Sequence, residues 1–195
     1  MLIIHKDLKP VLIKEYNELF ELIVVEISTQ ITTVRKITGY GPQENLSDDE
    51  IMPFWVALEE EISSAELNGR SVIIQMDANA KLGKSYIQGD PHNMSVNGRV
   101  FSGIIERHAL IVLNGLENKC TGIITRERHT VESIEKSVID FILTSNDIGK
   151  HVKYMHVDEE RNNVLAKIVR KKGNIEVKET DHNTITAELS IYRMD

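Results

Sequence analysis

The chain has a single cysteine, Cys120, in 195 residues, so it contains no pair that would form an intrachain disulfide. This shortage excludes the disulfide-stapled class of small secreted domains and indicates a reducing, intracellular compartment. Long apolar runs are missing too. None approaches the length of a membrane span, and the opening MLIIHKDLKP has too short an apolar segment for a signal peptide. With 41% hydrophobic residues, we expect one soluble domain over residues 1–195, with no membrane partner.

An excess of basic residues, which is typical of nucleic-acid enzymes, is also missing, because the formal net charge is −7. The distribution of charge weakens this objection. Residues 43–66 contain eight acidic residues and no basic one, so the rest of the chain has a net charge of +1. Residues 161–178 contain six basic residues against one acidic residue. Such a run is either a solvated face or a contact for a phosphate backbone, so the acidic total does not exclude DNA.

Residues 71–83, SVIIQMDANAKLG, contain a short apolar run of the kind that forms a buried strand. The run ends at Asp77, and alternation along a strand would direct Asp77 and Asn79 to the same side. A carboxylate and a carboxamide at the end of an apolar strand are costly unless they are hydrogen-bonded or bind something. The alternative is a simple turn, which Asp and Asn also favour.

Three other stretches place polar side chains at or within strand-like apolar segments. Taken alone, each residue has a simpler interpretation: a buried carboxylate satisfied by backbone groups, a packed tyrosine, or a turn before a strand. The stretches are residues 36–44 (KITGYGPQE, with Tyr40), residues 137–143 (SVIDFIL, with Asp140) and residues 180–183 (TDHN, with Asp181 and His182).

In this order, a strand-end Tyr, Asp-x-Asn, an Asp within a strand and Asp-His resemble the endonuclease/exonuclease/phosphatase superfamily. GYGPQE, Thr125-Arg126 and KSVIDFIL look most like the reverse-transcriptase-associated endonuclease domains of non-LTR retrotransposons. The resemblance runs from about residue 2 to residue 191. It implies an α/β (α+β) fold, a sandwich of two sheets flanked by helices. The family's first strands, which supply an active-site Asn and a metal-binding Glu, have no counterpart here, so we expect a domain that is incomplete at its N-terminus.

The resemblance implies phosphodiester hydrolysis with Mg²⁺, or Mn²⁺ in its place, and DNA as the substrate. It also implies a reverse transcriptase domain in a longer parent chain, which would allow a nuclear location. The alternatives are a catalytically incomplete nucleic-acid-binding module and a phosphatase acting on a small substrate. The implied roles are an acid–base residue (Asp77), a residue that holds it or a phosphate oxygen (Asn79), a hydrogen-bond donor to the phosphate (Tyr40), an orienting carboxylate (Asp140), a histidine on the scissile phosphate (His182) and a metal ligand (Asp181).

Hydrophobic spacing also predicts the elements around these motifs. A helix should start after Ser47 with Glu50 in a capping box, with a kink or a later start at Pro53, and should end at Asn68-Gly69. His92 is expected to be a solvated residue in a structureless loop, residues 84–97. The remaining expectations are strands at 2–5, 11–14, 19–28 (central), 32–39, 110–113, 122–126, 138–144, 153–158 and 184–191, a polar loop at 127–136, helices at 98–109 and 146–149, and a hairpin of 164–169 with 175–180.

Overall fold

The computed structural model describes residues 8–17, 20–29, 32–163, 166–171 and 174–190, and for 166–171 and 174–179 it describes the backbone alone. Among these residues, no helix is long and apolar enough to cross a membrane. The expected strand at residues 2–5 lies outside the described residues.

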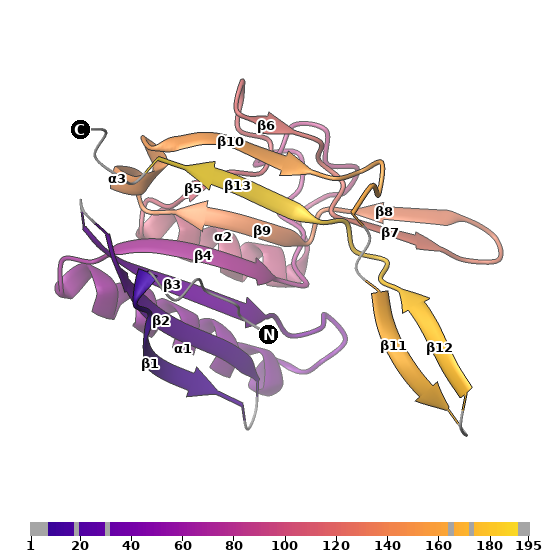
Figure 1. The fold of residues 1–195 in the computed structure, drawn as a ribbon, viewed down its shortest axis with the longest axis horizontal. Coiled ribbons are helices and arrows are strands. Elements are labelled where there is room, and N and C mark those ends of the chain that lie inside the picture. Colours follow the sequence, from indigo (N-terminus) through magenta and orange to yellow (C-terminus); the bar gives the residue numbers. More distant parts are fainter. Residues whose placement is uncertain (1–7, 18–19, 30–31, 164–165, 172–173, 191–195) are drawn as a thin grey trace.

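A six-stranded mixed sheet forms the centre of the described structure, in the order β1–β2–β3–β4–β9–β5 (Figure 1). β3 and β4 are parallel and therefore end at the same edge of the sheet, and β9 begins at that edge because it is antiparallel to β4. One edge thus collects the ends of three neighbouring strands. The strands are β1 (Val11–Tyr16), β2 (Glu21–Ser28), β3 (Thr33–Tyr40), β4 (Ser71–Asp77), β9 (Asp140–Thr144) and β5 (Ile111–Val112).

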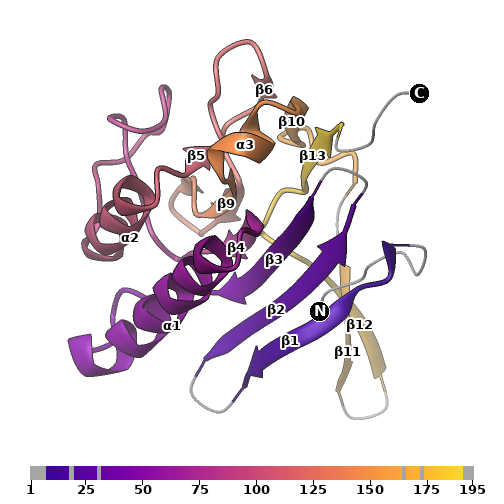
Figure 2. The ribbon, with the colours of Figure 1, turned by 90° about the vertical axis from the view of Figure 1, so that its left-hand side faces the viewer.

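Two helices, α1 (Asp48–Leu67) and α2 (Val96–Arg107), cover one face of this sheet (Figure 2). α1 begins as predicted after Ser47, whose backbone N–H donates to the Glu50 carboxylate at 3.0 Å. It ends at Asn68, followed by Gly69 with φ +62°. The helix contains Pro53 without starting later, and the proline costs it the one hydrogen bond that would reach the Asp49 carbonyl. The main hydrophobic core lies between these helices and the sheet and includes Phe54, Trp55, Leu58, Ile74, Phe101 and Phe141.

A second, three-stranded sheet packs over the β9 end of the other face, in the order β13–β10–β6. Its strands are β13 (Ile185–Leu189), β10 (Val152–Val157) and β6 (Cys120–Thr121), and the short helix α3 (Asn146–Gly149) links β9 to β10. A smaller core of Leu113, Ile142, Val152, Met155 and Val157 fills the space between the two sheets. The predicted layered architecture, with mixed sheets and flanking helices, is therefore confirmed.

Two β-hairpins extend from the same side of the molecule (Figure 1). The first consists of β7 (Arg126–His129) and β8 (Ile134–Ser137), and the second of β11 (Ala166–Lys171) and β12 (Asn174–Glu179). The first corrects the prediction of a polar loop at 127–136, and the expected strand at 122–126 is wrong, because pairing begins only at Arg126. The second was predicted. Many of the basic residues at 161–178 belong to it, and their side chains lie outside the described part.

Three other predictions differ from the structure. The strand over 19–28 was expected to be central, but β2 is second from the edge of its sheet. The helix expected at 98–109 begins two residues earlier, because Ser95 accepts a hydrogen bond from the Gly98 N–H and caps it. The expected strand at 138–144 begins only at Asp140.

Candidate active site

Tyr40, Asp77 and Asp140 lie at one level across three neighbouring strands. Tyr40 pairs with Asp77 between β3 and β4, and Asp77 pairs with Asp140 between β4 and β9. Residues directly opposite each other in a sheet point to the same face. The sheet therefore brings two carboxylates and a tyrosine together from positions 40, 77 and 140 of the chain.

His182 completes this group from the segment before β13. Its Nδ1 atom lies 3.1 and 3.0 Å from the two carboxylate oxygens of Asp140. Its Nε2 atom lies 3.8 Å from Oδ2 of Asp77. The hydrogen bond to Asp140 raises the pKa of His182 above its usual value against the opposing effect of burial, and the charges of Asp140, Asp77 and Asp181 add to the increase. Asp140 therefore both orients the His182 ring and stabilises its protonated form.

Asp77 is in a less favourable environment than an ordinary carboxylate. Its side chain is 14% exposed, and Oδ1 accepts a hydrogen bond from the Asn79 N–H at 3.0 Å. Burial, followed by the nearby charge of Asp140, raises the pKa of Asp77 to about 6. Asp77 is therefore a carboxylate that changes its protonation state close to neutral pH.

The loops after β3 and β4 are fastened to each other beside Asp77. The Asn79 side chain donates to the Gly41 carbonyl at 2.9 Å, and the Gly41 N–H donates to the Asp77 carbonyl at 2.6 Å. A Cβ on Gly41 would lie 2.2 Å from the carbonyl oxygen of Ala78, so only glycine fits. The buried Asn97 adds a third tie, since its amide donates to the Pro42 carbonyl at 2.8 Å.

Two buried polar residues hold the backbone of Asp140. The Thr125 hydroxyl accepts hydrogen bonds from the N–H groups of Ile139 and Asp140 at 2.9 and 3.0 Å. The Asn114 amide donates to the Asp140 carbonyl at 3.0 Å. Thr125 and Asn114 therefore fix the strand start that presents the carboxylate to His182.

Asp181 has a different partner from the other two carboxylates. Its Oδ2 atom accepts a hydrogen bond from Nε of Arg126 at 2.8 Å, and its Oδ1 atom lies 3.8 Å from Nε2 of His182. Partial burial works against ionisation, but the hydrogen bond from Arg126 lowers the pKa of Asp181 below its ordinary value. Asp181 is ionised at neutral pH, with one oxygen committed to a guanidinium.

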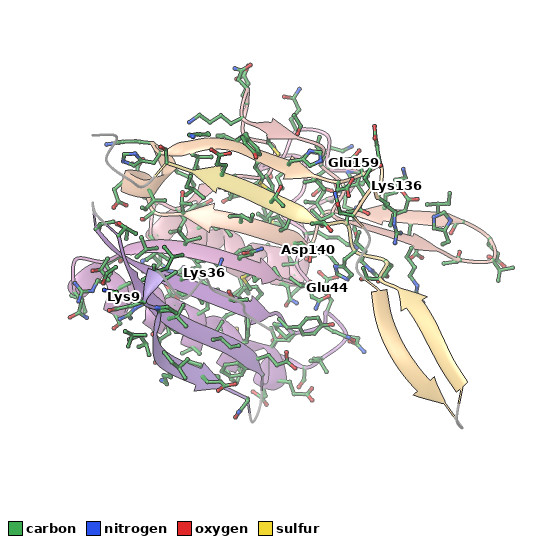
Figure 3. All side chains as sticks on the ribbon, in the orientation of Figure 1. Lys9, Lys36, Glu44, Lys136, Asp140 and Glu159 are labelled. Atoms are coloured by element: carbon green, nitrogen blue, oxygen red, sulfur yellow. The ribbon has the colours of Figure 1, made fainter. Side chains whose placement is uncertain are left out.

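A cleft of about 700 Å³ is lined by five of the six predicted site residues, all except Asp140. Tyr40 lies at its edge, with 46% of the residue exposed. Figure 3 marks Asp140 at the start of β9, with Glu44 and Lys136, which line the cleft, on either side of it. The lining residues are Tyr40, Gln43, Glu44, Asn45, Asp77, Asn79, Lys81, His92, Arg126, Arg128, Glu135, Lys136, Ser137, Ile139, Asp181 and His182.

The centre of the site has the donor set of a divalent cation site. Asp77, Asp140 and His182 each offer a ligand atom, and these atoms lie within 4.8 Å of one another. Hard cations prefer carboxylate oxygens, and a cation between Asp77 and Asp140 would relieve the repulsion that raises the pKa of Asp77. Asp181, the implied metal ligand, is not a member of this group.

No family model matches the sequence, and no curated protein matches it. Solved structures match its fold. The endonuclease domain of TRAS1, a telomere-specific non-LTR retrotransposon, superposes with a TM-score of 0.61 at 19% identity, over 95% of this chain and 71% of that one. The 3′-5′ exonuclease NExo from Neisseria meningitidis gives 0.59 at 17% identity, over 85% and 64%. A mannosyl-6-phosphatase from Bacteroides thetaiotaomicron gives 0.53 at 15% identity, over 87% and 55%.

The chain has the endonuclease/exonuclease/phosphatase fold. Proteins with this fold include a nuclease of a retrotransposon, a bacterial exonuclease and a sugar phosphatase. The chain spans 71, 64 and 55% of the length of these three structures. These three structures therefore establish the fold of the chain, and the chemistry has to be argued from the cleft itself.

All six predicted site residues lie in or beside the cleft. The structure places Asp77, Asp140 and His182 in mutual contact, Asn79 beside Asp77, Tyr40 at the edge, and Asp181 on Arg126. Reasoning from the sequence missed the positioning residues Asn97, Asn114 and Thr125, and it treated His92 as solvated although His92 lines the cleft. Only Thr125 had left a signal, as part of the Thr125-Arg126 motif.

Proposed function

We propose that this chain is a divalent-metal-dependent phosphodiesterase that nicks DNA, with Mg²⁺ as the preferred ion and Mn²⁺ as a substitute. The observation that carries the proposal is the Asp77–Asp140–His182 group at the edge of an endonuclease/exonuclease/phosphatase sheet. The likeness to the TRAS1 endonuclease domain supports DNA as the substrate. A reverse transcriptase domain in a longer parent chain is a further part of the proposal and rests on the sequence resemblance alone.

The hydrogen bond between His182 and Asp140 determines what the imidazole does. With the Nδ1 proton donated to Asp140, the Nε2 atom remains free to act in the cleft. Because the pKa of His182 is raised, the ring carries a positive charge over a wider range of pH. Its Nε2–H then donates to a non-bridging oxygen of the scissile phosphate and stabilises the charge that accumulates there.

Asp77 acts as the acid–base residue. With a pKa of about 6, it is mostly ionised above neutral pH and accepts a proton from the attacking water. Its Oδ2 atom lies 3.8 Å from Nε2 of His182, so a water or phosphate oxygen between them would contact both groups. Hydrolysis should therefore rise as pH passes the pKa of Asp77, which a bound cation would lower from its metal-free value of about 6, and fall again above the raised pKa of His182.

The remaining residues support these two. Asn79 holds the Asp77 carboxylate through its backbone N–H, and the Tyr40 hydroxyl donates to a phosphate oxygen at the edge of the cleft. A bound divalent cation would be held by Asp77 and Asp140 of the Asp77–Asp140–His182 group and would supply Lewis acidity for the phosphate. Asp181, which lies outside that group, is the ligand implied by the resemblance and would join through the oxygen that Arg126 leaves free. Arg126 keeps Asp181 ionised for this purpose.

The test is nicking of supercoiled plasmid by the purified chain in Mg²⁺ and in EDTA. We expect nicking in Mg²⁺ alone, reduced by about 10²–10⁴-fold in Asp77→Asn and in His182→Gln, because each removes a group that transfers or donates a proton. Matched controls are Asp49→Asn and His156→Gln, which change exposed residues outside the cleft. Full nicking by Asp77→Asn or His182→Gln would refute the proposed roles.

Other outcomes would identify the alternatives. Hydrolysis of a soluble phosphate monoester while plasmid stays supercoiled would identify a phosphatase, as in the Bacteroides relative of the fold. Salt-sensitive DNA binding without cleavage in Mg²⁺ or Mn²⁺ would identify a nucleic-acid-binding module. Either result would replace the proposed function.

A further inference from the structure

The loop between β4 and α2 is a closed structure. Its stem is fastened by two hydrogen bonds between Lys81 and Ser95: the Lys81 N–H donates to the Ser95 hydroxyl at 3.1 Å, and the Ser95 N–H donates to the Lys81 carbonyl at 3.0 Å. A Cβ on Gly98 would lie 2.0 Å from the Lys81 carbonyl oxygen, so the first turn of α2 packs directly on this stem. The backbone of Lys81 is therefore held rigidly.

A buried carboxylate organises the tip of the same loop. Asp90 is fully buried; Oδ2 accepts the Gly83 N–H at 3.2 Å and Oδ1 accepts the His92 N–H at 2.9 Å. These bonds join the two sides of the loop and present His92 at the cleft, with 34% of its side chain exposed. The segment is therefore a compact surface loop whose two ends lie close together, and loops of this kind are often functional.

Lys81 and His92 thus line the cleft together on the side of Asn79. Lys81 differs from the arginines and the other lysine of the cleft: Arg126 is paired with Asp181, Lys136 is paired with Glu127 at 3.0 Å, and Arg128 is exposed on the β7–β8 hairpin. In the part of the chain that the structure describes, the Lys81 ammonium group has neither an ion pair nor a hydrogen bond. A rigidly mounted and unneutralised cation in a cleft is suited to an anion that comes from outside.

We propose that Lys81 and His92 bind a second phosphate, next to the scissile one, of a polynucleotide backbone. The inference rests on the proposed function and narrows it. A cleft with one phosphate position accepts any phosphate ester, whereas one with two positions favours a chain of linked phosphates. Lys81 supplies the charge and His92 supplies an N–H donor. Asp90 is a positioning residue that acts through His92, whose backbone it holds.

The first test compares a substrate that has one phosphate with one that has many. Lys81→Gln should lower kcat/KM for a duplex oligonucleotide by about tenfold, as expected for one lost charge-assisted hydrogen bond, mainly through KM. Hydrolysis of bis(p-nitrophenyl) phosphate, which has a single phosphate, should fall much less. His92→Gln should show the same selectivity with a smaller loss. Lys84→Gln is the matched control, because Lys84 is exposed in the same loop and does not line the cleft.

The second test does not depend on catalysis. Binding of a fluorescent duplex is measured in EDTA at several salt concentrations. Lys81→Gln should reduce the slope of log Kd against log salt by about 1, because one phosphate contact is lost, and Lys84→Gln should leave it unchanged. An unchanged slope, or an equal loss on both substrates, would overturn the inference. If the wild type hydrolyses neither substrate, the proposed function fails. The change in the slope of log Kd against log salt still tests whether Lys81 binds a phosphate.

Discussion

A cluster of charged side chains lies near each end of strand β3, and the two clusters differ in how their charges are balanced. Near its start, Arg35 lies between Glu26 at 2.8 Å and Glu61 at 3.4 Å, on the face covered by α1. At its end, on the other face, Tyr40 stands beside Asp77 and Asp140. In the first cluster a guanidinium, which is always charged, separates the carboxylates. In the second, Asp77 and Asp140 are neighbours in the sheet and share the titratable imidazole of His182.

This difference between the clusters shifts the pKa values of their carboxylates in opposite directions. The hydrogen bond from Arg35 lowers the pKa of Glu26, whereas burial and Asp140 raise the pKa of Asp77 to about 6. The Arg35 cluster has satisfied charges and a structural role. The Asp77 cluster retains negative charge and therefore has capacity for a cation or a proton. A buried ionic group indicates function only when its charges are not balanced.

The largest effect is expected from breaking the balanced cluster. Arg35→Met would leave Glu26 and Glu61 without their shared cation, and should lower the free energy of unfolding by about 3–5 kcal/mol. Urea denaturation measures this loss, with Arg99→Met, an exposed position on α2, as the control. A loss below about 1 kcal/mol would show that neighbours such as Arg70 replace Arg35 and that the cluster is less tightly balanced than it looks.

An intermediate effect of opposite sign is expected at the other cluster. Because the pKa of Asp77 is about 6 when folded and 3.8 when unfolded, the folded state binds more protons between these values, and stability falls as pH rises through this window. Asp77→Asn removes this penalty and should stabilise the chain by roughly 1–3 kcal/mol at pH 8, but not at pH 3.5. Denaturation at both pH values, beside Asp49→Asn, measures it. Equal stability of Asp77→Asn and wild type at pH 8 would contradict it.

The smallest effect is expected from the ion itself. Mg²⁺ at ten times its dissociation constant should stabilise the wild type by roughly 1.4 kcal/mol and raise its melting temperature. Asp77→Asn should lose most of this shift, because a neutral amide no longer attracts the cation. A shift that persists in Asp77→Asn would place the ion elsewhere, with Asp181 as the next ligand to change.

Much of the fold is predictable because its signals are local. The capping box at Ser47 and Glu50 and the apolar run before Asp77 each lie within one element. The β7–β8 hairpin is not predictable in this way, since most of its residues are polar and its pairing supplies the only signal. Residues that merely hold others are the hardest to predict. Thr125 acts on a backbone 15 residues away, and Arg126 on a carboxylate 55 residues away.

The glycine at position 41 shapes the cleft by what it lacks. No side chain fits against Ala78, so a single codon change there would force apart the loops that carry Tyr40 and Asn79. Ala78 belongs to the main core and is fully buried, so its backbone has little room to move away from a new side chain. The arrangement of the cleft therefore depends on a residue that has no functional group, and a search for important positions that considers only polar side chains would overlook it.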